Sequence, residues 1–161
     1  MFHHQRHLVL CGLAALLYAG TVQAAPLPTR PILTLEAART IVNAAEAKAK
    51  AEGWPCVIAV VDSGGLPIIV ERMDDAAVIA GVDLAPGKAR AAALFRRSTG
   101  ALEDAINGPR AAAITARGFV LMRGGVPITV GGYIVGAIGV SADTPAHDEV
   151  IANAGIAAFA P

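Results

Sequence analysis

The sequence predicts an α+β protein in which helices pack on a five-stranded antiparallel sheet. Short runs rich in β-branched residues are separated by Gly-Gly pairs, which favour turns between neighbouring antiparallel strands. Longer segments on either side carry apolar residues at helical spacing. The expected order is helix, two strands, several helices, three strands and a final helix. This order is typical of helices packed against one antiparallel sheet.

The composition is that of a folded chain whose core consists of small aliphatic residues. Hydrophobic residues make up 55% of the 161 residues, charged residues 16% and aromatic residues 4%. A chain of this kind buries enough apolar surface to fold, which excludes a disordered protein. The formal net charge is +0 and no stripe of basic residues is present, so nucleic acid is not an expected partner.

The first 24 residues are typical of a cleavable export signal. A short polar segment precedes an apolar run at residues 8–19, and small or short residues then lead to an expected cut after Ala24. The run is too short to cross the roughly 30 Å hydrocarbon core of a membrane. We expect a periplasmic or secreted protein without stable membrane insertion after cleavage, with an uncleaved amphipathic anchor as the alternative. Cleavage would remove Cys11 and leave Cys56 as a small core residue without a disulfide partner.

After the signal, the sequence predicts a linker, a helix and a hairpin. Residues 25–32 contain three prolines and favour an extended linker. Thr34 is a good N-cap residue, apolar residues then recur at helical spacing, and Gly53 ends the helix. Residues 56–61 and 66–72 are short apolar runs on either side of a turn, which predicts two antiparallel strands.

The middle of the chain predicts short helical pieces. Asp74 and Asp75 can cap a helical turn, and Pro86 suits the first turn of a helix that runs to about Arg97. Glycine, asparagine and proline then interrupt the pattern, and residues 110–116 predict a further helical turn.

The last third predicts a three-stranded meander and a helix. The expected strands are residues 119–122, 126–130 and 133–141, joined by Gly-Gly turns. Asp143 or Thr144 caps the final helix, and the proline that follows suits its first turn.

Three Gly-Gly pairs, at 64–65, 124–125 and 131–132, invite comparison with phosphate-binding loops. Each pair lies between two expected strands, where glycine supplies the positive φ of a hairpin turn. A phosphate cradle needs a helix to follow the glycines, so we interpret all three pairs as turns. The common nucleotide, hydrolase and paired-cysteine motifs are absent, and no catalytic residue is predicted.

His147 is the one histidine downstream of the predicted cut, and it is followed by Asp148 and Glu149. The three side chains could bind a metal ion, with His147 and Glu149 as the candidate ligands. Alternatively, the acids complement the dipole at the start of the last helix. Sequential neighbours on a helix point in different directions, which favours the second interpretation. A Ser-His-Asp triad is formally possible, but no serine has the setting of a nucleophile.

Basic residues cluster near the end of the expected middle helix: Lys88, Arg90, Arg96 and Arg97. Positive charge near a helix C-terminus is favourable in itself. The cluster could instead hold the carboxylates of a ligand, because guanidinium groups form strong paired hydrogen bonds with carboxylates.

Several motifs occur together in an order that resembles one family. They include VVDSGG at 60–65, GGVPI at 124–128 and VGAIGVS at 135–141. In this order the chain resembles the GlcG/HbpS family of haem-binding proteins, also found as the C-terminal domain of PduO-type proteins. The resemblance runs from residue 33 to residue 159, and we place the domain at residues 33–161.

The resemblance implies an α/β sandwich akin to profilin-like and GAF-like folds, haem as cofactor, and homo-oligomers that are often octamers. Thr99 matches a threonine of the family's Phe-x-x-x-Thr segment, which approaches the haem iron. Arg96, Arg97 or Lys88 would then meet the haem propionates. Side chains of the usual iron-ligand types are few in the expected mature chain: His147, Met73, Met122, Tyr133 and Cys56.

The resulting hypothesis is an exported haem-binding protein that acts in transport, sensing or protective sequestration under oxidative stress, rather than in catalysis. Two alternatives stay open. The protein could be an enzyme that acts on haem or on a small organic acid, or a non-catalytic oligomeric module that mediates interactions.

Overall fold

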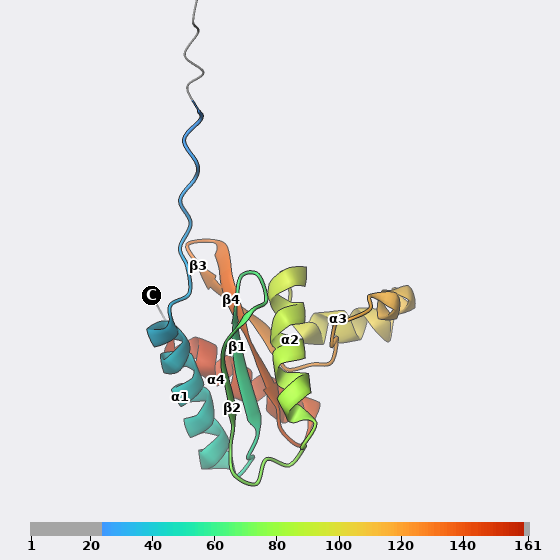
Figure 1. The fold of residues 1–161 in the computed structure, drawn as a ribbon. Coiled ribbons are helices and arrows are strands. Elements are labelled where there is room, and N and C mark those ends of the chain that lie inside the picture. The colour runs from blue at the N-terminus through green and yellow to red at the C-terminus, as the bar shows by residue number, and fades with distance from the viewer. Residues whose placement is uncertain (1–23, 160–161) are drawn as a thin grey trace, which may run out of the picture.

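The computed structural model describes residues 24–159, so the predicted export signal lies outside them except for Ala24. One antiparallel sheet has the strand order β2-β1-β4-β3 (Figure 1). Its strands are β1 (Val57–Asp62), β2 (Pro67–Arg72), β3 (Gly125–Val130) and β4 (Tyr133–Ser141). The helices are α1 (Leu35–Glu52), α2 (Gly81–Phe95), α3 (Thr99–Ile106), α4 (Pro145–Ala158) and the 3-10 helix η1 (Ala111–Thr115). The predicted α+β class is confirmed.

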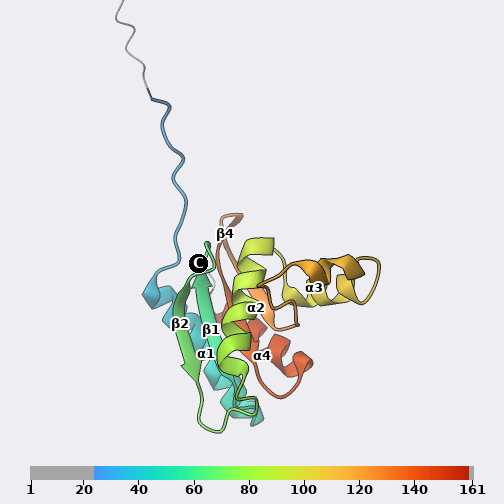
Figure 2. The ribbon, with the colours of Figure 1, turned by 45° about the vertical axis from the view of Figure 1, so that its right-hand side comes forward.

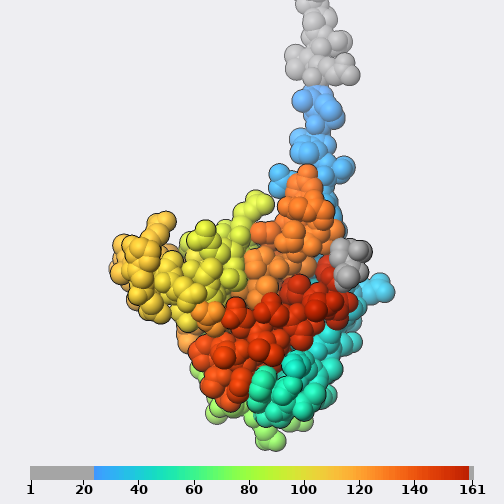
Figure 3. Space-filling view, turned by 180° about the vertical axis from the view of Figure 1, so that it is seen from behind, coloured from blue at the N-terminus to red at the C-terminus, as the bar shows by residue number. Residues whose placement is uncertain are grey.

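Helices cover both faces of the sheet. In Figure 2, α2 crosses in front of the sheet while α1 and α4 lie behind it, and Figure 3 shows α4 beside α1 on that rear face. Successive side chains of a strand point to opposite faces, so a strand covered on both sides is apolar throughout. Accordingly, Ile58 and Val60 of β1 pack in the cluster beneath α1 and α4, whereas Val61 packs beneath α2.

Small residues bring α2 close to the sheet. Ala89, Ala92 and Ala93 pack on Ala137 of β4. A Cβ atom on Gly139 would lie only 2.1 Å from the carbonyl oxygen of Ala85, so only glycine fits there. The abundance of alanine and the scarcity of aromatic residues therefore reflect short distances between the layers.

The predicted caps are confirmed. The Thr34 hydroxyl accepts a hydrogen bond from Ala37 N at 3.2 Å, and Gly53 ends α1 in the left-handed conformation with φ of 72°. The Thr144 hydroxyl accepts from His147 N at 3.2 Å at the start of α4. None of the helices within residues 24–159 is long and apolar enough to cross a membrane.

The fifth strand is a correction, because the part of the chain that the structure describes has four strands and residues 119–122 are irregular. Phe119 packs edge-on against Phe95, with ring centroids 4.9 Å apart. The Val120 side chain fills the space beside Gly87, where a Cβ atom would lie 2.4 Å away. This apolar segment packs on α2 instead of pairing with β3.

Three smaller predictions also change. Residues 74–75 form a turn without a helix, and α2 begins at Gly81, so Pro86 lies inside it rather than in its first turn. The pairs at 64–65 and 131–132 are hairpin turns, as predicted. Gly124 has a φ of 113° but precedes the first strand of its hairpin, so the pair at 124–125 is not a hairpin turn.

Candidate functional site

A pocket of about 250 Å³, which we call the apolar pocket, lies between α3, η1 and residues 119–122. Its lining residues are Glu103, Ile106, Ile114, Phe119, Leu121 and Met122. Glu103 is the one charged residue among them, and Met122 is 45% exposed. A mostly apolar concavity with few polar groups is typical of a small-molecule site. The α3 and η1 segments project from the body of the molecule (Figure 3).

The end of α2 supplies an aromatic contact and positive charge at the edge of this pocket. Phe95 packs edge-on against Phe119, and the guanidinium of Arg90 lies 5.6 Å from the centroid of the Phe119 ring. Arg97 is exposed and follows closely after Phe95. An apolar wall with an arginine at its edge can take a flat apolar ligand that carries a carboxylate.

Thr99 is buried beside the first residues of β3. Its hydroxyl accepts a hydrogen bond from Gly125 N at 2.7 Å. Ser98 caps the same helix, because its hydroxyl accepts from Ala101 N at 3.3 Å. The two side chains therefore fix the start of α3, and the Thr99 hydroxyl faces the interior rather than solvent.

Lys88 is also in the interior, where it is 1% exposed. Its ammonium donates to Asp148 Oδ2 at 2.5 Å and to the Val140 carbonyl at 3.0 Å, and Asp148 Oδ1 accepts from Ala142 N at 2.5 Å. Burial raises the pKa of the Asp148 carboxyl, and the hydrogen bond from Lys88 opposes that shift. The carboxylate that Lys88 meets thus belongs to the protein itself, so Lys88 is not placed to bind a ligand at the surface.

His147 and Glu149 diverge. The His147 ring stacks on Trp54 with centroids 3.6 Å apart, and its Nδ1 lies 2.7 Å from Asp143 Oδ1. Glu149 instead accepts from Arg123 at 2.8 Å. Across residues 24–159, no group of three His, Cys, Asp or Glu side chains is arranged to hold a metal ion. The two predicted metal ligands are therefore not brought together.

Sequence reasoning missed Arg123. Its guanidinium pairs with Glu149 at 2.8 Å, with Asp104 at 2.6 Å and with Glu103 at 3.6 Å, while its backbone N–H donates to Glu103. The bonds to Glu149 and Asp104 raise the pKa of Arg123. These contacts join α3, which forms one wall of the apolar pocket, to α4. No local spacing in the sequence indicated the pairing, because the partners come from distant segments.

Arg96 and Arg97 are adjacent in sequence but differ in placement. Both are exposed, and Arg96 ends α2 in the left-handed conformation with φ of 55°. Arg96 lines a second pocket together with Arg30. Arg97 lines neither that pocket nor the apolar one.

The family model described as haem degrading protein HbpS-like matches residues 33–157. The chain belongs to the HbpS-like family. Protein GlcG of Escherichia coli K12 is 42% identical over 113 residues, which cover 70% of this chain and 84% of GlcG. The resemblance to the GlcG/HbpS family is therefore confirmed.

Two solved structures share the fold. A double mutant of HbpS from Streptomyces reticuli superposes with a TM-score of 0.74 at 31% identity, covering 86% of this chain and 99% of that one. A structure described as a PduOC:haem complex gives a TM-score of 0.71 at 27% identity, covering 80% of this chain and 96% of that one.

Proposed function

We propose that this family member binds haem in the apolar pocket, and that it is an exported protein that carries, senses or sequesters haem. The observation that carries the proposal is an apolar concavity with an arginine at its edge, against which the first residue of the predicted Phe-x-x-x-Thr motif packs. The family's description and the haem complex of a related fold support the same ligand class. Export rests on the sequence of the first 24 residues.

The residues at this pocket suit the parts of a haem molecule. Ile106, Ile114 and Leu121 would cover one face of the macrocycle by apolar contact. Arg90, whose guanidinium lies over the Phe119 ring, would pair with a propionate, since charge-assisted hydrogen bonds to carboxylates are among the stronger polar contacts. A cavity of about 250 Å³ is smaller than a porphyrin, so the opposite face would be covered by a second copy in a homo-oligomer.

Met122 is better placed than Thr99 to meet the iron. The thioether of methionine is a known axial ligand of haem iron. Met122 lines the pocket and is half-exposed, whereas the Thr99 hydroxyl is buried and hydrogen-bonded to Gly125. In this proposal Thr99 positions the start of α3 and Met122 supplies the ligand.

Haem titration of the mature chain tests the proposal. We expect a saturable shift of the Soret band, a changed spectrum and weaker binding in Met122→Leu, and weaker binding in Arg90→Gln. Met73→Leu and Arg39→Gln are the matched controls, because Met73 does not line the apolar pocket and Arg39 lies on α1, on the other face of the sheet. The absence of a shift at micromolar haem would overturn the proposal.

The same sample distinguishes haem carriage from haem degradation. Degradation is the activity named in the family's description. A carrier or sequestering protein keeps the Soret band when a reductant and oxygen are added. Loss of the band, with release of iron, would instead establish haem breakdown.

A further inference from the structure

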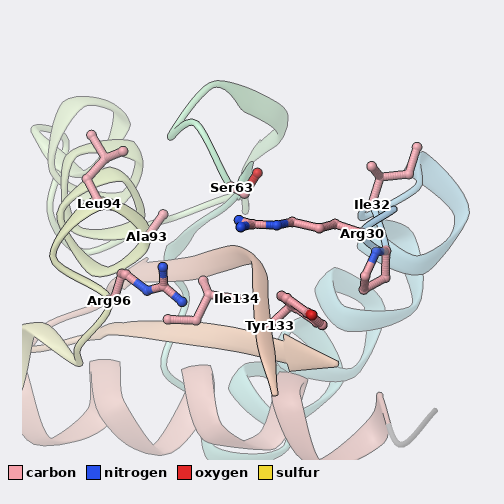
Figure 4. Close-up of a pocket in the computed structure, with 9 residues that line it drawn as sticks. Arg30, Ile32, Ser63, Ala93, Leu94, Arg96, Tyr133 and Ile134 are labelled. Atoms are coloured by element: carbon pink, nitrogen blue, oxygen red, sulfur yellow. The ribbon is translucent and has the colours of Figure 1, made fainter. Parts of the chain in front are cut away.

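A second pocket, of about 280 Å³, lies at the opposite end of α2 from Gly81, and we call it the arginine pocket. Its lining residues are Arg30, Pro31, Ile32, Ser63, Ala93, Leu94, Arg96, Tyr133 and Ile134. They come from the linker before α1, the β1–β2 turn, the end of α2 and the start of β4 (Figure 4). It shares no lining residue with the apolar pocket.

Two guanidinium groups converge on this pocket. In Figure 4, Arg30 extends across the cavity toward Ser63, and Arg96 reaches toward it from the end of α2 beside Ile134. Within residues 24–159, neither arginine forms an ion pair with a carboxylate. Two arginines without a counter-charge at one cavity create a positive potential that attracts anions.

The surroundings orient these groups. The guanidinium of Arg30 lies 5.5 Å from the ring centroid of Tyr133, a cation–π contact that leaves its N–H edge available. Arg96 occupies a left-handed helix end that usually favours glycine. Ser63 and Tyr133 add hydroxyl groups, while Ile32, Leu94 and Ile134 add apolar wall.

We propose that the arginine pocket binds a small organic dicarboxylate. Its two carboxylates pair with Arg30 and Arg96, and its carbon chain lies against the apolar wall. Guanidinium groups match carboxylates in paired geometry, and the apolar wall favours an organic anion over inorganic phosphate. The proposal does not depend on haem, since the two pockets are lined by different residues.

Calorimetric titration of the haem-free mature chain with succinate tests this inference. We expect saturable binding that weakens about tenfold in Arg30→Gln and in Arg96→Gln, since each loses a charge-assisted contact. Tyr133→Phe removes only a hydroxyl and should weaken binding less. Arg39→Gln is the matched control, an exposed arginine on α1 outside the pocket. Circular dichroism checks that each variant is folded. If Arg96→Gln fails to fold, the Arg30→Gln variant tests the proposal alone, because Arg30 lies outside every helix and strand.

The other outcomes are equally decisive. Absence of saturable heat, or wild-type affinity in both arginine variants, would overturn the proposal. Equal affinity for phosphate would overturn the assignment to organic carboxylates, and acetate should bind more weakly than succinate. Succinate added to haem-loaded protein should leave the Soret band unchanged, whereas displacement of haem would show one shared site. Failure of haem to bind would leave the succinate result standing.

Discussion

Lys88 and Asp148 form a buried ion pair between α2 and α4. The Asp148 carboxylate takes hydrogen bonds from Lys88 and from Ala142 N, and Lys88 also bonds to the Val140 carbonyl. Two charges removed from water are tolerated only when each is paired and hydrogen-bonded. The pair therefore links α2, on one face of the sheet, to α4, on the other face, beside β4.

Asp148→Asn is expected to destabilise the protein by about 3 kcal/mol, because it leaves the Lys88 ammonium buried without a counter-charge. Urea denaturation followed by circular dichroism measures the change. The double variant Lys88→Met, Asp148→Leu should recover part of the loss, since it removes both charges together but leaves Ala142 N without its acceptor. Asp74→Asn, at an exposed loop position, should leave stability unchanged. Wild-type stability in Asp148→Asn would show that the pair does not hold the fold.

Cys56 is a buried thiol whose sulfur lies 3.7 Å from that of Met73. Burial raises the pKa of the Cys56 thiol from its ordinary value of 9.0 to about 12. The contribution of the buried, protonated thiol to the free energy of folding is therefore fully present below pH 9. It is lost as pH rises toward 12, because the thiol of the unfolded chain ionises first. At pH 8 the thiol of the folded chain is therefore almost entirely protonated.

Iodoacetamide at pH 8 should consequently label Cys56 only when the chain is unfolded in urea. Mass spectrometry of the native and the denatured protein measures the modified fraction. Rapid labelling of the native protein would contradict the burial of this thiol.

At the scale of elements, α3 depends on its neighbours. It has 8 residues, too few for a helix to be stable alone in water. Thr99 ties its start to Gly125, and Arg123 links its acidic residues to Glu149 of α4. Single exposed ion pairs contribute little, but a network around one guanidinium contributes more.

Arg123→Gln should release α3 without unfolding the sheet. We expect faster hydrogen exchange in residues 99–106 and weaker haem binding, because α3 supplies one wall of the apolar pocket. Lys50→Gln, which removes the exposed pair with Glu46 on α1, is the matched control and should change neither property. Exchange in α3 equal to that of the wild type would show that other contacts hold the helix.

The contrast between α1 and residues 119–122 explains which elements the sequence could predict. Thr34 and Gly53 set the ends of α1 through contacts within a few residues, so local pattern suffices. Residues 119–122 have the composition of a buried strand, and it is contacts with distant α2, at Gly87 and Phe95, that lead them to pack there. The sequence likewise made Lys88 a candidate ligand, because its partner Asp148 lies 60 residues away and no local pattern indicates the pair.

At the scale of the whole molecule, the α2 side of the sheet is only partly covered. Val70 on β2 pairs with Ala59, which packs beneath α2, so both side chains lie on that face. Val70 is nevertheless 47% exposed, and Leu66, in the turn just before β2, is 62% exposed. Exposed apolar side chains at an uncovered strand are typical of an interface.

We therefore expect sedimentation of the mature chain to show a homo-oligomer. Val70→Lys places a charge on the uncovered face and should reduce the mass of the assembly. Arg39→Lys, on the outer surface of α1, should not. A monomer at the concentrations used for haem titration would contradict the proposed role of a second copy.

The linker does more than connect the predicted export signal to the domain, since it carries Arg30 to the arginine pocket. Residues 25–32 form no helix or strand, so a chain that begins at Ile32 keeps every element of the fold. It loses one guanidinium of the pocket and the contact of Arg30 with Tyr133.

We expect this truncated chain to unfold at the same temperature as the mature chain and to bind haem equally well. Its affinity for succinate should fall as far as that of Arg30→Gln, measured in the same titration. Undiminished succinate binding would exclude the linker from the site, and a lower unfolding temperature would show that the linker also supports the fold.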